Sequence, residues 1–116
     1  MEKFSTITKE DLKKKIDERG DFALIDVLGA MSYAQRHLPG AISIPGSNEN
    51  FVAEVQKAVG GDKSKEVIVY CASFSCQASP AAAGKLADAG FTNVRDFKGG
   101  LADWEEGGYE FSAKKE

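Results

Sequence analysis

A short apolar run that leads directly into a cysteine and then into an alanine-rich segment constrains this chain most. Residues 65–80 read Lys-Glu-Val-Ile-Val-Tyr-Cys-Ala-Ser-Phe-Ser-Cys-Gln-Ala-Ser-Pro. The β-branched run at 67–70 predicts a buried strand, and the alanines of 78–89 predict a helix. Pro80 fits only the first turn of that helix, where the N–H group that it lacks would have no partner. Cys71 therefore stands where a buried strand turns into a helix.

The rest of the chain repeats this alternation of strands and helices. Thr8, with an acidic residue three positions later, predicts the start of a first helix that ends by Gly20. Apolar runs predict further strands at 22–27, 41–44 and 93–97, and helical spacing or turn signals predict further helices at 30–37, 51–59 and 101–106. We therefore expect an α/β fold: a small open parallel β-sheet with helices on both faces, in one domain spanning residues 1–116. Ligands of such sheets bind at the carboxyl ends of the strands, where Cys71 falls.

Composition narrows the function classes. A net charge of −3 argues against binding to nucleic acid or to an anionic membrane. No apolar run has transmembrane length and the first residues lack the apolar core of a signal peptide, so a cytoplasmic location is expected. Two cysteines and one histidine are too few for a zinc site, and no metal or cofactor is expected.

The turn after Cys71 predicts a reactive thiol. Where a strand turns directly into a helix, successive backbone N–H groups converge near the positive end of the helix dipole. A thiolate at that point is stabilised, which lowers the pKa of the thiol and makes it a nucleophile at neutral pH. This hypothesis requires the sulfur to face those amides and to be reachable from water. The amides expected to form the cradle belong to Ala72, Ser73, Phe74, Ser75, Cys76 and Gln77.

Several segments together resemble the rhodanese-type sulfurtransferase family. The resemblance extends over residues 22–110, and the motifs occur in the order and spacing of the family. They are the strand signature Leu-Ile-Asp-Val at 24–27, the His-Leu-Pro-Gly-Ala segment within 33–45, the strand Val-Ile-Val-Tyr-Cys at 67–71, and the C-terminal signatures at 89–94 and 99–104.

The resemblance implies a sulfurtransferase without a cofactor. Cys71 would take up a sulfane sulfur as a persulfide and pass it to a thiol, to cyanide or to a protein acceptor. Its donor would be a polysulfide, a persulfide or thiosulfate. Family members often carry an arginine in the loop, but here Ala72 and Cys76 occupy those positions. The lack of a positive charge in the loop favours polysulfide or persulfide donors over thiosulfate.

Alternatives remain for both cysteines. Cys76 is either a resolving thiol, which attacks a persulfide on Cys71 and releases sulfide, or a small apolar residue that fills the packing between helix and sheet. Two other functions use the same residues: a thiol–disulfide redox protein with the Cys71/Cys76 pair, and a catalytically idle rhodanese module that acts in protein interaction. His37 and Asp26 are interpreted as hydrogen-bonded structural residues rather than as a catalytic base and acid.

Overall fold

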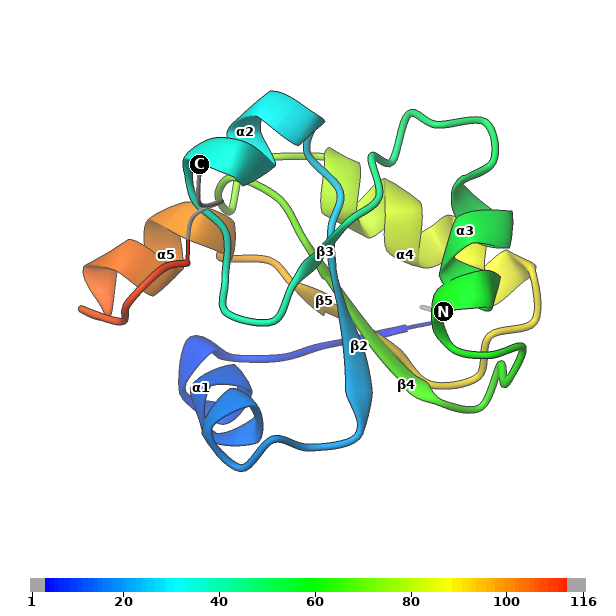
Figure 1. Cartoon of the computed structure of the whole chain (residues 1–116), viewed down its shortest axis with the longest axis horizontal. Coiled ribbons are helices and arrows are strands. Elements are labelled where there is room, and N and C mark those ends of the chain that lie inside the picture. Colours follow the sequence, from blue (N-terminus) through cyan, green and yellow to red (C-terminus); the bar gives the residue numbers. More distant parts are fainter. Residues whose placement is uncertain (1–3, 113–116) are drawn as a thin grey trace.

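The computed structural model describes residues 4–112, and its five strands form one parallel sheet (Figure 1). The strand order is β1-β5-β4-β2-β3, so β4 lies in the middle with a partner on each side. The expected open parallel α/β fold is confirmed. The strands are β1 (Ser5–Thr6), β2 (Phe22–Asp26), β3 (Ile42–Ser43), β4 (Glu66–Tyr70) and β5 (Val94–Phe97).

Helices cover both faces of the sheet. The helices are α1 (Lys9–Asp17), α2 (Ala30–Gln35), α3 (Phe51–Ala58), α4 (Ala78–Asp88) and α5 (Gly100–Glu106). Helices α3 and α4 supply side chains to the core on one face, and α1 and α5 supply the core on the other (Figure 1). Helix α2 has no buried residue and lies beyond the carboxyl end of β2. Within the described residues, no helix is both long enough and apolar enough to span a lipid bilayer.

The central position of β4 in the sheet explains why its residues are apolar on both faces. Val67 and Val69 belong to the core under α3 and α4, whereas Ile68 and Tyr70 belong to the core under α1 and α5. All four side chains are completely buried. Successive side chains of a strand point to opposite faces, and Cys71 continues this alternation into the α3/α4 core.

Helix α1 begins as the sequence predicts. The side chain of Thr8 accepts a hydrogen bond from the Asp11 amide at 3.2 Å, as an N-cap residue should. The helix ends at Asp17, short of the predicted end at Gly20, and Arg19 takes the left-handed conformation, with φ 54°.

Two other elements differ from the predictions. Strand β1 was not predicted, because it has two polar residues and exists through its pairing with β5. Helix α2 ends at Gln35 instead of residue 37, since Arg36 is extended with φ −167° and ψ 148°. His37 then pairs with Ser112 near the other end of the chain.

Candidate functional site

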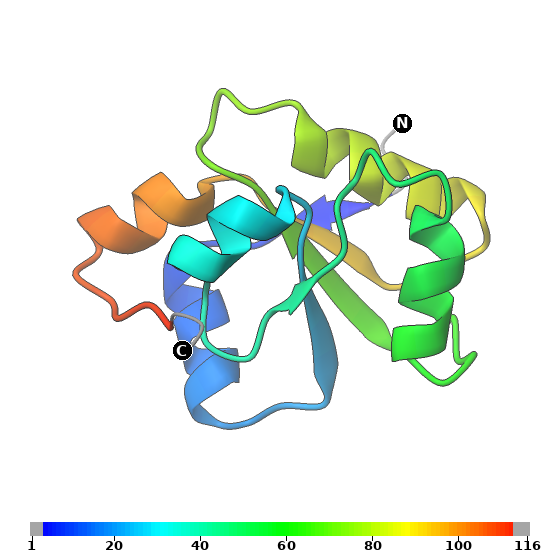
Figure 2. The ribbon, with the colours of Figure 1, turned by 45° about the horizontal axis from the view of Figure 1, so that its top comes forward.

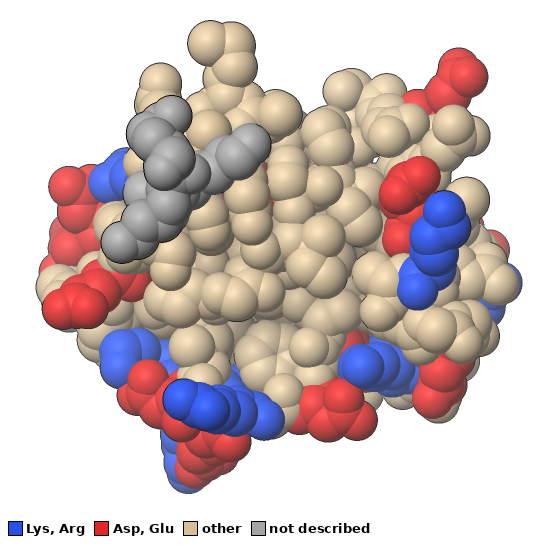
Figure 3. All heavy atoms as spheres, viewed as in Figure 1, with Lys and Arg blue, Asp and Glu red and all other residues tan. Residues whose placement is uncertain are grey.

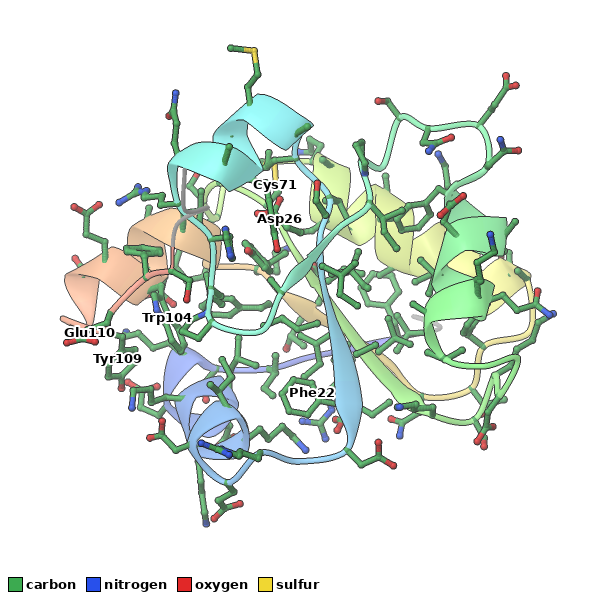
Figure 4. All side chains as sticks on the ribbon, viewed as in Figure 1. Phe22, Asp26, Cys71, Trp104, Tyr109 and Glu110 are labelled. Carbon is green, nitrogen blue, oxygen red and sulfur yellow. A yellow bond between two sulfur atoms is a disulfide. The ribbon has the colours of Figure 1, made fainter. Side chains whose placement is uncertain are left out.

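Cys71 lies one residue beyond β4, at the carboxyl-end edge of the sheet. Figure 4 shows it with Asp26 at this edge, below α2. Its Sγ is 3.5 Å from the Oγ of Ser79, which belongs to the first turn of α4. The sulfur therefore stands beside the start of an 11-residue helix, whose dipole favours negative charge there.

Cys71 and Cys76 are joined by a disulfide. Their Cα atoms are 6.5 Å apart, inside the range of roughly 4.4 to 6.8 Å in which such a bond forms. Cys76 is half-buried and packs against the α3/α4 core, while Cys71 is 0% exposed. The requirement that the Cys71 sulfur be reachable from water is not met in this disulfide form.

The loop of residues 72–77 crosses the top of the molecule between β4 and α4 (Figure 2). The Cys76 amide donates to the Ser73 carbonyl at 3.1 Å, so that amide is engaged within the loop. Among residues 4–112, the amides of Ala72, Ser73, Phe74, Ser75 and Gln77 have no hydrogen-bond acceptor. The amide cradle thus stays a prediction for these five amides. The Cys76 amide would first have to break its hydrogen bond to the Ser73 carbonyl before it could join them.

Helix α5 holds the start of the loop in place. The Leu101 amide donates to the Cys71 carbonyl at 3.0 Å, and the Ala102 amide donates to the Ala72 carbonyl at 2.9 Å. Gly100 makes this approach possible, because it has φ +60° and any Cβ there would collide with the Cys71 carbonyl and lie 2.9 Å from the Ala72 carbonyl carbon. The Gly-Gly signature of the sequence therefore positions the cysteine through a backbone contact that the sequence alone did not reveal.

Ser79 and Asp96 complete the surroundings of the sulfur, and sequence analysis missed both. Asp96 is 0% exposed, and neither carboxylate oxygen has a hydrogen-bond partner of good geometry among the described residues. Burial raises the pKa of its carboxyl group, while hydrogen bonding from the nearby Ser79 hydroxyl lowers it less strongly. The available signal was an acidic residue two positions after Val94, which places it on the same inward face of β5.

Asp26 has a structural role on the opposite face of the sheet. Its Oδ2 accepts from the Tyr70 hydroxyl at 2.8 Å and its Oδ1 from the Leu28 amide at 2.9 Å. The Tyr70 hydroxyl in turn accepts from the Leu38 amide at 3.1 Å. Burial is the main cause of the raised pKa of Asp26. The interpretation of Asp26 as a hydrogen-bonded acid is confirmed.

His37 also braces the fold. Its Nδ1 is 2.7 Å from the Tyr33 carbonyl oxygen, and its ring stacks on the Tyr33 ring with centroids 3.8 Å apart. Its backbone exchanges hydrogen bonds with Ser112. These partners agree with the interpretation of His37 as a structural residue.

Two long segments that contribute to the site carry no charged side chain. Residues 37–48 and 67–84 contain no Lys, Arg, Asp or Glu. Figure 3 views the molecule from the same side as Figure 1, and the upper middle of this face is free of charged side chains. The charged side chains gather over α1 and at the margins. Phe74 is 65% exposed and borders a surface hollow of about 310 Å³ with Lys98 and Asp103. In the part of the chain that the structure describes, no cluster of His, Cys, Asp or Glu is arranged to hold a metal ion.

The fold and the strand-end cysteine agree with a comparison to known families. A family model described as "Rhodanese-like domain" matches residues 8–107. The chain belongs to the rhodanese-like domain family. The match includes Cys71, the loop after it and the Gly-Gly turn before α5.

Individual relatives of this rhodanese-like chain have different names. It is 30% identical over 102 residues to the HTH-type transcriptional regulator Rv0324 of Mycobacterium tuberculosis. This match covers 88% of the chain and 42% of that protein. It is 28% identical over 101 residues to the adenylyltransferase and sulfurtransferase UBA4 of Candida albicans, covering 86% of the chain and 23% of that protein. The chain thus spans less than half the length of these two relatives.

A solved structure shows the same fold. The crystal structure of the BH2092 protein from Bacillus halodurans superposes with a TM-score of 0.84 at 31% sequence identity, over 94% of this chain and 77% of that one.

Proposed function

We propose that this rhodanese-like domain is a sulfurtransferase that carries sulfane sulfur as a persulfide on Cys71. One observation carries the proposal. This chain is a member of the family, and its Cys71 lies one residue past the central strand β4, with the sulfur beside the first turn of α4. Membership of the family and the relative named as a sulfurtransferase support sulfur transfer in general. Since Cys71 is buried in the disulfide form, uptake begins with reduction of the disulfide and opening of the loop.

Uptake is a displacement at sulfur. The Cys71 thiolate attacks the sulfane sulfur of a polysulfide or persulfide donor, the S–S bond of the donor breaks, and the remaining donor thiolate leaves. The loop amides and the α4 dipole stabilise the negative charge of the persulfide. A thiol or cyanide then takes the outer sulfur and restores the Cys71 thiolate.

The deciding experiment is to locate the transferred sulfur. The protein is reduced with an external thiol, freed of it, and incubated with polysulfide. Intact mass and peptide mapping then show which cysteine has gained a sulfur atom. Sulfur on Cys71 supports the proposal, and a protein that stays unmodified contradicts it.

We propose further that Cys76 acts as the resolving thiol. The Cys76 thiolate attacks Sγ of a persulfidated Cys71, a Cys71–Cys76 disulfide forms, and sulfide leaves with the electron pair of the broken S–S bond. The 6.5 Å separation of the two Cα atoms supports this step. An external thiol afterwards reduces the disulfide for the next cycle.

Replacing Cys76 with serine should therefore slow sulfide release from the persulfidated protein when no external thiol is present. We expect at least about a tenfold decrease in rate, because serine does not attack a persulfide at neutral pH. A sulfide-selective probe measures the release. Ser75→Ala serves as a control within the same loop and should release sulfide like the parent. Equal rates for Cys76→Ser and the parent would mean that Cys76 only packs.

The uncharged loop should make thiosulfate a poor donor. Turnover with polysulfide is expected to exceed turnover with thiosulfate by at least about tenfold, since no cation in the loop binds the sulfonate group. Ala72→Arg, which places a cation where many family members have one, should raise kcat/KM for thiosulfate and leave polysulfide turnover nearly unchanged. Rapid turnover of the parent at low thiosulfate concentration would contradict the preference.

The disulfide itself favours a second candidate function, thiol–disulfide exchange by the Cys71/Cys76 pair. The two functions differ in what the reduced protein does with a sulfur donor. A redox protein equilibrates with glutathione buffers at a defined potential and gains no sulfur from polysulfide. Measurement of the potential together with the mass of the polysulfide-treated protein separates the two.

A further inference from the structure

Asp96 is a buried carboxyl group whose two oxygens have no hydrogen-bond partner of good geometry among the described residues. It lies on β5 beside Val69 of β4 and is 0% exposed. Buried polar groups are normally hydrogen-bonded, and each exception asks for an explanation. Ser79, also 0% exposed, acts on this carboxyl group through its hydroxyl without reaching good hydrogen-bond geometry, and its Oγ is 3.5 Å from the Cys71 sulfur. Ser79 is thus the hydroxyl common to the orphaned carboxyl group and the cysteine.

The charges around Asp96 are few. Its register partners on the neighbouring strands, Val69 of β4 and Thr6 of β1, are uncharged, and the residue of α4 that acts on it is Ser79. The charged group that acts on the carboxyl is Lys98, two residues further along the chain and exposed. A thiolate and a carboxylate together would place two negative charges in a buried space whose loop supplies no cation.

We propose that Asp96 and Cys71 share one proton through the Ser79 hydroxyl. This makes Asp96 a positioning residue for the proposed sulfur transfer, and the inference rests on Cys71 being the reacting thiol. The buried pair then carries a single negative charge, either as thiol and carboxylate or as thiolate and carboxylic acid.

The transfer balances without any other reactant. The Cys71 thiol gives its proton to Ser79 Oγ as the Ser79 hydroxyl proton passes to a carboxylate oxygen of Asp96. The thiolate attacks the sulfane sulfur of the donor while the proton stays on Asp96. When an acceptor later removes the outer sulfur and Cys71 leaves as a thiolate, the proton returns by the same path. No charge enters or leaves the buried space in either proton transfer.

The test is the pH dependence of alkylation of Cys71 by iodoacetamide in the full chain with Cys76→Ser, which keeps Cys71 as a thiol. We expect two steps in the alkylation rate, because the pair loses its protons at two separate pH values. In Asp96→Asn, one step should remain, at a pH at least about one unit below the upper step of the parent. Alkylation at neutral pH should then be about tenfold faster, since one pH unit is a factor of ten in thiolate.

Asp26→Asn is the matched control. Asp26 is an equally buried carboxyl group at the same edge of the sheet, but it lies on the other face and is bonded to Tyr70 and Leu28. Its replacement should leave both steps in place. Identical profiles for Asp96→Asn and the parent would overturn the proposal.

Ser79→Ala keeps the test decisive if Asp96→Asn does not fold. Removing the hydroxyl removes the path that stabilises the shared proton, so the two steps should move closer together. Unchanged spacing between the steps would overturn the proposal. Because alkylation involves no sulfur donor, this result is independent of whether Cys71 takes up sulfur.

Discussion

Replacing Cys71 with serine is expected to abolish sulfur uptake from polysulfide, with a loss of at least about a thousandfold in rate. A serine hydroxyl is not ionised at neutral pH, and its oxygen does not form the persulfide that the transfer requires. The measurement is the intact mass of the reduced variant after incubation with polysulfide. Serine occupies almost the same volume as cysteine, so the substitution removes the thiol and the disulfide without leaving a large cavity.

Cys76→Ser is the matched control for this experiment, since it also removes one thiol and the disulfide. It should take up one sulfur atom, located on Cys71 by peptide mapping. If Cys71→Ser gains sulfur on Cys76 at the parent rate, the roles of the two cysteines are reversed, and the proposed mechanism is wrong.

Replacing Gly100 with alanine should destabilise the fold by about 2 to 5 kcal/mol. A positive φ costs a residue with a Cβ about 1 to 2 kcal/mol, and forced overlap in a packed region costs about 1 to 3 kcal/mol more. The overlap is with backbone atoms of Cys71 and Ala72, which cannot move aside as a flexible side chain would. Urea unfolding followed by fluorescence of Trp104 measures the loss.

Gly60→Ala separates the two causes. Gly60 has φ +65°, close to the φ +60° of Gly100, but nothing lies within 4 Å of a Cβ built on it. Its replacement should cost only the backbone strain, about 1 to 2 kcal/mol. Equal losses in the two variants would mean that the overlap with the Cys71 and Ala72 backbone adds nothing to the cost of the substitution.

The fold was predictable because its main signals are local. The run at 67–70 is buried on both faces, and residues 22–26 are apolar except at their end. Each run therefore predicts an interior parallel strand from a few residues. The Thr8 cap and the position of Pro80 in the first turn of α4 are equally local. The position of Cys71 followed from these elements, since it is the first residue after the central strand.

The features that were missed depend on contacts between distant parts of the chain. Strand β1 exists through pairing with β5, and the α5 amides reach the loop across a separation of about thirty residues, from Leu101 to Cys71. Complete burial of Cys71 and the orphaned carboxyl of Asp96 depend on how α4 lies on the sheet. No pattern of sequence periodicity contains that information.

The role of Cys76 was open for a physical reason. Whether two cysteines five residues apart meet depends on the path of the loop, and a resolving thiol and a packing residue have the same sequence signature. The structure supplies the separation of their Cα atoms, and Cys76 also packs against the core. Both interpretations of Cys76 are thus compatible in geometry, and the release of sulfide decides between them.

The place of β4 in the sheet has a consequence for amide hydrogen exchange. Its backbone is hydrogen-bonded to β2 on one side and β5 on the other, so its amides should exchange only through global unfolding. The loop beyond it is closed by the Cys71–Cys76 disulfide and is bonded at its start to α5, but within residues 73–77 the backbone hydrogen bond is the one from Cys76 to Ser73. Once the disulfide is reduced, the amides of these residues should exchange through small local openings. In the reduced protein, a donor molecule can therefore gain access to Cys71 by a fluctuation of a few residues, while the strand that carries the sulfur stays rigid.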